Sequence, residues 1–169
     1  MSDIRAILGE ETPRLRRYAV ALTRDANEAD DLVEDTLREA IARGFESRDE
    51  MALRVWLLTI LHEQRDNPFR LPDPTATLRR PQLNPAAEAT LSRFDRALGR
   101  LPEGERAAIL LIGLEGMTHD ATAEILAISA TAMRTRLLRA RESLARQMAA
   151  PTEAPARRPQ RARRVSRAA

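Results

Sequence analysis

Residues 116–141 read GMTHDATAEILAISATAMRTRLLRAR, and this stretch decides the fold of the second half of the chain. Its apolar spacing predicts a short helix, a tight turn and a longer helix. Ala123 is small enough to let the two helices approach closely, and Ser129 is a suitable N-cap for the second helix. The apolar residues that we expect between the helices are Leu126, Ile128, Met133 and Leu137.

The longer helix carries four arginines on the faces that its apolar residues leave exposed: Arg134, Arg136, Arg139 and Arg141. A helix that buries one side and presents cations on the others suits the major groove of DNA. The alternative is a solvated basic face on an ordinary helical hairpin. The coincidence of turn, small residue and basic helix favours a DNA-binding helix-turn-helix.

Composition excludes several classes of site. The chain has 169 residues and no cysteine, so it has no disulfide, thiolate zinc site or cysteine nucleophile. Its two histidines, His62 and His119, are far apart in sequence, and no nucleophile–base pair or phosphate loop is evident. We therefore expect neither an enzyme nor a bound metal or cofactor. Without a long apolar run or a signal peptide, we expect a soluble, cytoplasmic protein that does not bind membranes.

Proline and charge divide the chain. Five prolines fall between residues 68 and 85, which predicts a linker between two helical domains, residues 1–67 and 86–150. Because this linker offers little to bury, we expect the two domains to move independently. Residues 1–70 hold 11 arginines and 15 acidic residues, a net charge of −4. Residues 151–169 hold six arginines and one glutamate, a net charge of +5, and we expect a disordered basic tail there.

The first domain shows helical periodicity throughout, and β structure has almost no support. Pro13 is expected to interrupt or restart the first helix. Asp25 with Glu28, and Ser47 with Glu50, resemble capping boxes that open two further helices. The outward face of the earlier one is acidic and carries Asp30, Asp31, Glu34, Asp35 and Glu39. The sequence thus predicts an all-α protein of two small domains.

Four stretches, in order, resemble the extracytoplasmic-function sigma factors, the smallest group of the bacterial sigma-70 family of transcription initiation factors. They are LRRYAVALTR at 15–24, ADDLVEDTL at 29–37, LRVWLLTILH at 53–62, and LPEGER at 101–106 running on through residue 141. The resemblance implies a region 2-like bundle followed by a region 4-like helix-turn-helix domain. It covers roughly three quarters of the chain.

The resemblance also implies roles for particular residues. An acidic helix face would dock on the clamp helices of the RNA polymerase beta-prime subunit, through Asp30, Asp31, Leu32, Glu34 and Asp35. The promoter −10 element would be contacted by Trp56, His62, Gln64 and Arg65. The −35 element would be read as duplex DNA by Thr131, Arg134, Thr135 and Arg136, with Arg139 and Arg141 on phosphates. Trp56 considered alone is better explained as a core residue.

Two functions remain open at this point. The first is an initiation factor that recruits the polymerase core enzyme to promoters and is regulated by an anti-sigma factor. The second is a sigma-like mimic that occupies an anti-sigma factor or the polymerase without initiating transcription. Ala127 stands where the family usually has glycine in the helix-turn-helix turn, and a left-handed alanine costs roughly 1 kcal/mol.

Overall fold

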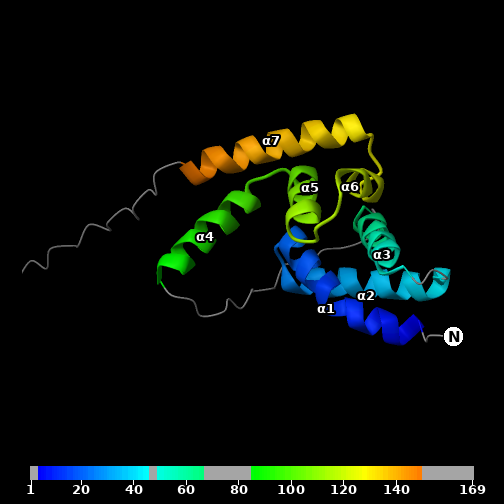
Figure 1. The fold of residues 1–169 in the computed structure, drawn as a ribbon. Coiled ribbons are helices and arrows are strands. Elements are labelled where there is room, and N and C mark those ends of the chain that lie inside the picture. The colour runs from blue at the N-terminus through cyan, green and yellow to red at the C-terminus, as the bar shows by residue number, and fades with distance from the viewer. Residues whose placement is uncertain (1–3, 46–48, 67–84, 150–169) are drawn as a thin grey trace, which may run out of the picture.

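The structure, a computed structural model, describes residues 4–45, 49–66 and 85–149 (Figure 1). These residues form α-helices and no strand, which confirms the predicted all-α class. None of the helices in the described ranges is both long and apolar enough to cross a membrane. The predicted linker 68–85, apart from Pro85, and the predicted tail 151–169 lie outside the described residues.

The first half is a bundle of three helices: α1 (Ile4–Thr23), α2 (Ala26–Arg43) and α3 (Glu50–Arg65). Asp25 caps α2 by accepting a hydrogen bond from the Glu28 backbone N–H at 2.9 Å, as the sequence predicts. Gly44 ends the helix with φ of 71°, a conformation that favours glycine. The residues that α2 buries recur every three or four positions: Ala29, Leu32, Val33, Thr36 and Ala40.

Two local predictions for this half need correction. Helix α1 continues through Pro13 without a break, because Pro13 is exposed and removes only one backbone hydrogen bond from a long helix packed against α2. Helix α3 is capped by Asp49, whose carboxylate accepts from the Met51 backbone N–H at 2.9 Å. The predicted cap, Ser47, lies outside the described residues.

The second half contains α4 (Pro85–Gly99), α5 (Glu103–Gly113), α6 (His119–Ile125) and α7 (Ala130–Ala149). Helix α7 is long and packs against α4, α5 and α6, so it spans one side of this half (Figure 1). Proline begins α4 and glycine ends it, the asymmetry expected of helix termini. Helices α6 and α7 form the predicted helix-turn-helix.

The two halves share a core, which differs from the expectation that they move independently. Helix α5 packs against α1, and α6 packs against α3. Leu22, Leu61 and Leu111 are fully buried in one apolar cluster that takes residues from both halves. The composition of the linker could not predict this contact, because the residues that form the contact belong to the helices on either side of the linker.

Candidate nucleic-acid interface

The turn between α6 and α7 is held by backbone and side-chain hydrogen bonds. Thr118 caps α6 by accepting from the Ala121 backbone N–H at 3.1 Å. Ala127 adopts φ of 49°, a left-handed conformation that favours glycine. The Ile128 backbone N–H then donates to the Ala123 carbonyl at 3.0 Å, and Ser129 caps α7 as predicted, accepting from the Ala132 N–H. These bonds fix the direction in which α7 leaves the turn.

The inner face of the helix-turn-helix is an apolar cluster. Ala108 of α5, Ala123 of α6, and Met133 and Leu137 of α7 are its buried members. Leu126 and Ile128 pack against them from the turn. The apolar wedge predicted from the sequence is therefore confirmed, and Ala123 stands where the helices meet. Since this face is buried, only the remaining faces of α7 are available to a ligand.

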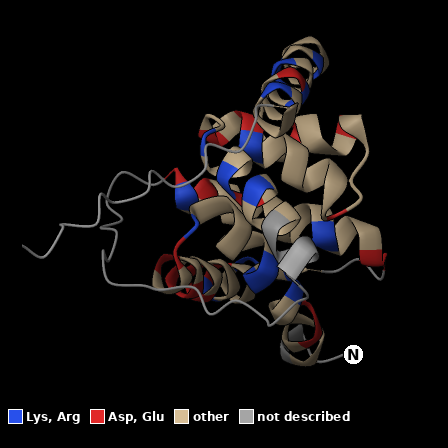
Figure 2. Cartoon of the chain, turned by 90° about the vertical axis from the view of Figure 1, so that its left-hand side faces the viewer, with Lys and Arg blue, Asp and Glu red and all other residues tan. Residues whose placement is uncertain are grey.

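The outer faces of α7 carry the predicted DNA-contacting residues. Thr131, Arg134, Thr135, Arg139 and Arg141 are exposed, and Arg136 is half-buried. Within the part of the chain that the structure describes, none of the four arginines forms an ion pair or a side-chain hydrogen bond. Basic positions recur along α7, the helix at the top of Figure 2. Cationic side chains without internal partners are suited to phosphates and base edges.

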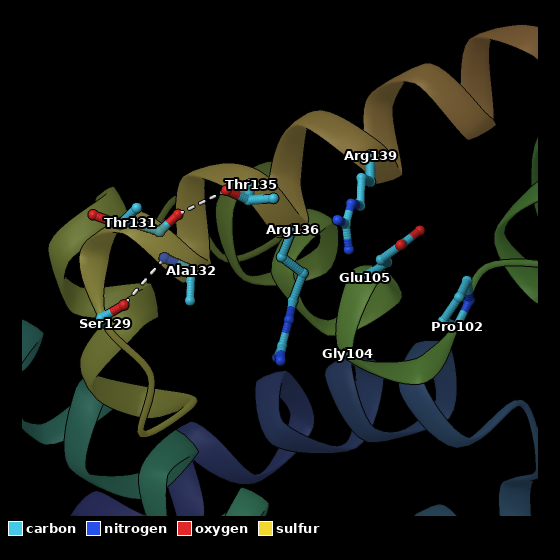
Figure 3. A pocket seen from close by; sticks show the side chains of 9 residues that line it. All are labelled: Pro102, Gly104, Glu105, Ser129, Thr131, Ala132, Thr135, Arg136 and Arg139. Carbon is cyan, nitrogen blue, oxygen red and sulfur yellow. Dashed lines mark hydrogen bonds between the residues drawn. The ribbon is translucent and has the colours of Figure 1, made fainter.

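Four of the six predicted residues line one hollow at the start of α7: Thr131, Thr135, Arg136 and Arg139 (Figure 3). The opposite wall is the first turn of α5, with Pro102, Gly104 and Glu105. A Cβ atom on Gly104 would lie 2.9 Å from the Arg136 Nη1, so a side chain at position 104 would require this guanidinium to shift from its place across α5. The sequence analysis did not predict that α5 forms this wall. The available signal was Gly104, a glycine inside the first turn of a helix.

The predicted acidic face of α2 is largely paired with arginines of the same half. Arg16 binds Asp30 through two hydrogen bonds and thereby lowers the pKa of that carboxyl. Arg38 bridges Glu34 at 2.6 Å and Asp35 at 2.7 Å. Among the described residues, Asp31 is exposed and has no such partner. The face is therefore acidic but mostly neutralised, apart from Asp31.

Leu32 requires a correction to the predicted docking set. Its side chain is fully buried in the core of the bundle, so it supports α2 from beneath and is not part of the exposed face. The helical period explains this, since Leu32 follows Ala29 by three positions on the inward stripe. The other four predicted residues are carboxylates, of which Asp30, Asp31 and Glu34 are exposed and Asp35 is half-exposed.

The residues predicted to contact the −10 element do not form one surface. Trp56 is partly buried and stacks on Phe45, with ring centroids 4.9 Å apart and planes at 28°. Gln64 is half-buried near the end of α3. His62 and Arg65 face the interior and the second half of the chain. Because these side chains lie on different faces of α3, no single ligand strand would meet all of them in this arrangement.

His62 is a buried core residue. Its Nε2 and the Tyr18 hydroxyl are hydrogen-bonded at 2.8 Å, and the Tyr18 side chain is fully buried. Burial lowers the pKa of His62 to about 4, against a smaller raising effect of Glu103. The imidazole is thus neutral at pH 7, and the predicted DNA contact requires a different arrangement of the chain.

Arg65 joins the two halves. Its Nε donates to Glu103 of α5 at 2.6 Å, its Nη2 to the same carboxylate at 3.0 Å, and its Nη1 to Glu28 of α2. The hydrogen bonds to Glu103 raise the pKa of Arg65, and Arg65 in turn lowers the pKa of Glu103. Sequence reasoning missed these carboxylate partners, because neither lies near Arg65 in sequence.

With this geometry established, comparison with known proteins identifies the class. Residues 8–62 match the family described as the sigma2 domain of PhyR, and residues 91–144 match sigma-70 region 4. The chain is 30% identical to the ECF RNA polymerase sigma factor EcfG of Rhodopseudomonas palustris over 140 residues, 78% of this chain and 77% of that protein. The chain therefore belongs to the ECF sigma factor family.

Solved structures agree with this assignment. The sigma factor RpoE from Bartonella quintana, in complex with the anti-sigma factor NepR, is 28% identical with a TM-score of 0.66, covering 88% of this chain and 98% of RpoE. CnrH, in complex with the cytosolic domain of CnrY, is 27% identical with a TM-score of 0.59, covering 86% and 88%. The predicted fold, a region 2-like bundle and a region 4-like domain, is confirmed.

Proposed function

We propose that this chain is a transcription initiation factor that binds the RNA polymerase core enzyme and directs it to promoters with −10 and −35 elements. One observation supports the proposal most directly: four arginines on the outer faces of α7 have no partner among the described residues, whereas its inner face is buried. Such a helix is placed to enter the major groove, where arginine recognises guanine through two hydrogen bonds. Family membership supports the same function.

The polymerase would bind the acidic face of α2. Asp31 is the residue to test, because it is exposed and its replacement breaks no ion pair that the described residues form. Asp31→Arg should weaken binding to core enzyme by about tenfold or more, since a cation would face the basic clamp surface that the family resemblance implies. Glu124→Arg, an equal charge change at an exposed position of α6, is the matched control. Equal affinities of the two variants would contradict this docking role.

We further propose that an anti-sigma factor binds this chain. The support is the related sigma factor RpoE, whose solved structure is a complex with the anti-sigma factor NepR and which this chain matches over 98% of the length of RpoE. Co-purification of the tagged chain from its own organism, followed by mass spectrometry, would identify such a partner.

The second candidate function is a mimic that binds a sigma-factor partner without initiating transcription. It is favoured by the positions of His62 and Arg65, two of the four residues assigned to the −10 element, which are held inside the chain. Run-off transcription decides between the two functions. Purified chain with core enzyme should give a specific transcript from a genomic promoter library if it is an initiation factor, and none if it is a mimic.

A further inference from the structure

Helix α7 carries two stripes of side chains that have the same spacing and lie on opposite sides of the helix axis. The inner stripe is buried and consists of Met133, Leu137 and Ala140. The outer stripe is exposed and consists of Thr131, Thr135 and Leu138. The outer stripe begins two residues before the inner one, which turns it by about 200° around the helix. It therefore points away from the core of the second half.

Leu138 is the large apolar residue of the outer stripe. Its side chain is 59% exposed, more than any other large apolar side chain in the described parts of the chain. The other large apolar residues of α7 are buried or half-buried. A single exposed leucine is common on protein surfaces and by itself indicates no function. Leu138 is distinguished by the charges on either side of it.

Arginines lie on both flanks of the outer stripe. Arg134 and Arg141 each follow a residue of the inner stripe by one position, which places them on one flank. Arg136 and Arg139 each precede a residue of the inner stripe by one position, which places them on the other flank. The face of α7 that points away from the core is thus cationic on both sides of Leu138.

The outer stripe itself offers few hydrogen-bond donors. Thr135 donates its hydroxyl hydrogen to the Thr131 carbonyl at 3.1 Å, so this hydrogen is not available to a ligand (Figure 3). Arg136 and Arg139 extend from α7 toward the first turn of α5, where both line the hollow described above (Figure 3). Their guanidinium groups therefore leave the outer stripe uncovered, and apolar groups predominate along it.

Duplex DNA has a surface that matches this pattern. Its major groove is about 12 Å wide and accepts a helix of about 10–12 Å diameter, and phosphates line both walls of the groove. On the floor of the groove, the C5-methyl group of thymine is the apolar feature that a side chain can recognise. The two flanks of α7 would face the phosphates, and Leu138 between them would face the floor.

We propose that Leu138 is a specificity-determining residue of α7, and that its side chain contacts the C5-methyl group of a thymine in the promoter element that α7 reads. This inference rests on the proposed function, since it requires α7 to enter the major groove, and it adds a residue and a base that the function alone does not specify. The arginines on the two flanks contact phosphates and neighbouring base edges.

Glu142 limits how far along α7 this contact extends. It is exposed and follows Leu138 by four positions, so it continues the outer stripe by one turn. A carboxylate on this face disfavours a close approach to phosphates. The contact with DNA is therefore confined to the first three turns of α7, which contain Leu138 and three of the four flanking arginines.

The closing test removes one methyl group from the DNA and the matching side chain from the protein. The full chain first selects a duplex from a random pool, and each thymine of that duplex is then replaced singly by deoxyuridine, which lacks only the C5-methyl group. Fluorescence anisotropy gives the affinity of the parent chain and of Leu138→Ala for every duplex. Leu91→Ala is the matched control, because Leu91 is also exposed, at 51%, but lies on α4.

For the parent chain and for Leu91→Ala, we expect one deoxyuridine replacement to weaken binding about fourfold, as the loss of one buried methyl group predicts. Leu138→Ala should bind the thymine duplex several-fold more weakly than the parent and should not respond to that replacement. Because Leu138 is exposed, the variant should keep the parent fold, which far-UV circular dichroism checks.

The possible failures are distinguishable. If the chain prefers one duplex but no deoxyuridine replacement weakens binding, or if Leu138→Ala responds to the replacement as the parent does, the thymine contact is overturned and sequence reading by α7 stands. If the chain prefers no duplex, sequence reading by α7 fails and the contact fails with it. A Leu138→Ala chain that keeps the parent's response to deoxyuridine but loses affinity for core enzyme would assign Leu138 to a protein contact instead.

Discussion

Four arginines at the contact between the halves differ in one respect from four arginines on α7: the former bind carboxylates, and the latter bind none among the residues that the structure describes. Arg14, Arg17, Arg24 and Arg65 each bind a carboxylate of the other half. In the described residues, Arg134, Arg136, Arg139 and Arg141, four of the five arginines of α7, bind none. The same residue type thus stabilises the contact between the halves in one region and provides accessible charge in the other. Charge counts over the sequence cannot distinguish these uses, because pairing depends on residues that are distant in sequence.

The largest effect that we expect is a loss of folding stability at acid pH, caused by the buried His62. The pKa of His62 is about 4 in the folded chain, below the ordinary value of 6.5. The unfolded chain therefore binds the extra proton between these values, and stability decreases as pH falls from about 6.5 to 4. The shift corresponds to a loss on the order of 3 kcal/mol by pH 4. Tyr18, Arg65 and Glu103 are the charged or titratable groups that act on this imidazole.

Urea unfolding of the parent chain and of His62→Gln at pH 7, 6 and 5 measures this effect. Glutamine can retain a hydrogen bond to the Tyr18 hydroxyl but has no proton to gain in this range. The variant should therefore lose less stability than the parent between pH 7 and 5. Both chains have the same carboxylates, so the difference between their losses is due to His62. Equal losses would mean that His62 is not kept neutral by burial.

The arginines of α7 should matter for DNA and not for folding. Arg134→Ala and Arg136→Ala should each reduce the preference for the −35 sequence by roughly 1–3 kcal/mol, if each recognises guanine through two hydrogen bonds. Arg141→Ala should weaken all duplexes about equally and lower the salt dependence. The measurement is binding to a duplex that the parent chain selects from a random pool, compared with a scrambled duplex. Three variants with the same loss on both duplexes would indicate a purely electrostatic helix.

A paired and an unpaired arginine provide the direct test of the comparison. Arg65→Ala removes the cation that binds both Glu28 and Glu103, and it should destabilise the chain by about 1–2 kcal/mol, because the site is only partly exposed. Arg139→Ala should change stability by less than about 0.5 kcal/mol, as is usual for surface substitutions. Denaturant unfolding of both variants at pH 7 gives the two values. Similar losses would remove the distinction between the two groups of arginines.

The sequence predicted the helix-turn-helix to the level of single residues. Its evidence is local: the small residue at 123, the cap at Ser129 and the apolar positions of α7 are all within one short stretch. Helix α2 was equally readable, because Asp25 and Gly44 mark both of its ends. Short-range hydrogen bonding and helical period are properties of neighbours in sequence, so a single chain reveals them.

The contact between the halves could not be predicted in the same way. Glu115 looks like an exposed acid beside a turn until Arg14 and Arg17 are placed next to it. His62 and Arg65 likewise looked like polar residues at an exposed helix end, whereas one is a core residue and the other an ion-pair centre. Which solvent-facing positions become buried depends on how two domains pack, and no local pattern encodes that packing.

The smallest expected effect concerns Ala127, whose left-handed backbone directs α7 and its unpaired arginines. At φ of 49° the alanine Cβ is strained, and glycine would relieve this strain. Glycine also gains freedom in the unfolded chain, which offsets part of the benefit. Ala127→Gly should therefore stabilise the chain by about 0.5 kcal/mol and at most about 1 kcal/mol.

Ala145→Gly, at an exposed position inside α7, is the control and should instead destabilise the chain by roughly 1 kcal/mol, because the helical conformation there favours alanine. Changes in melting temperature of opposite sign in the two variants would confirm that the effect of glycine on stability depends on the turn conformation at position 127. If both substitutions destabilise the chain, Ala127 is not strained. DNA affinity should be unchanged in Ala127→Gly, since the hydrogen bonds that orient α7 are made by Ala123, Ile128 and Ser129.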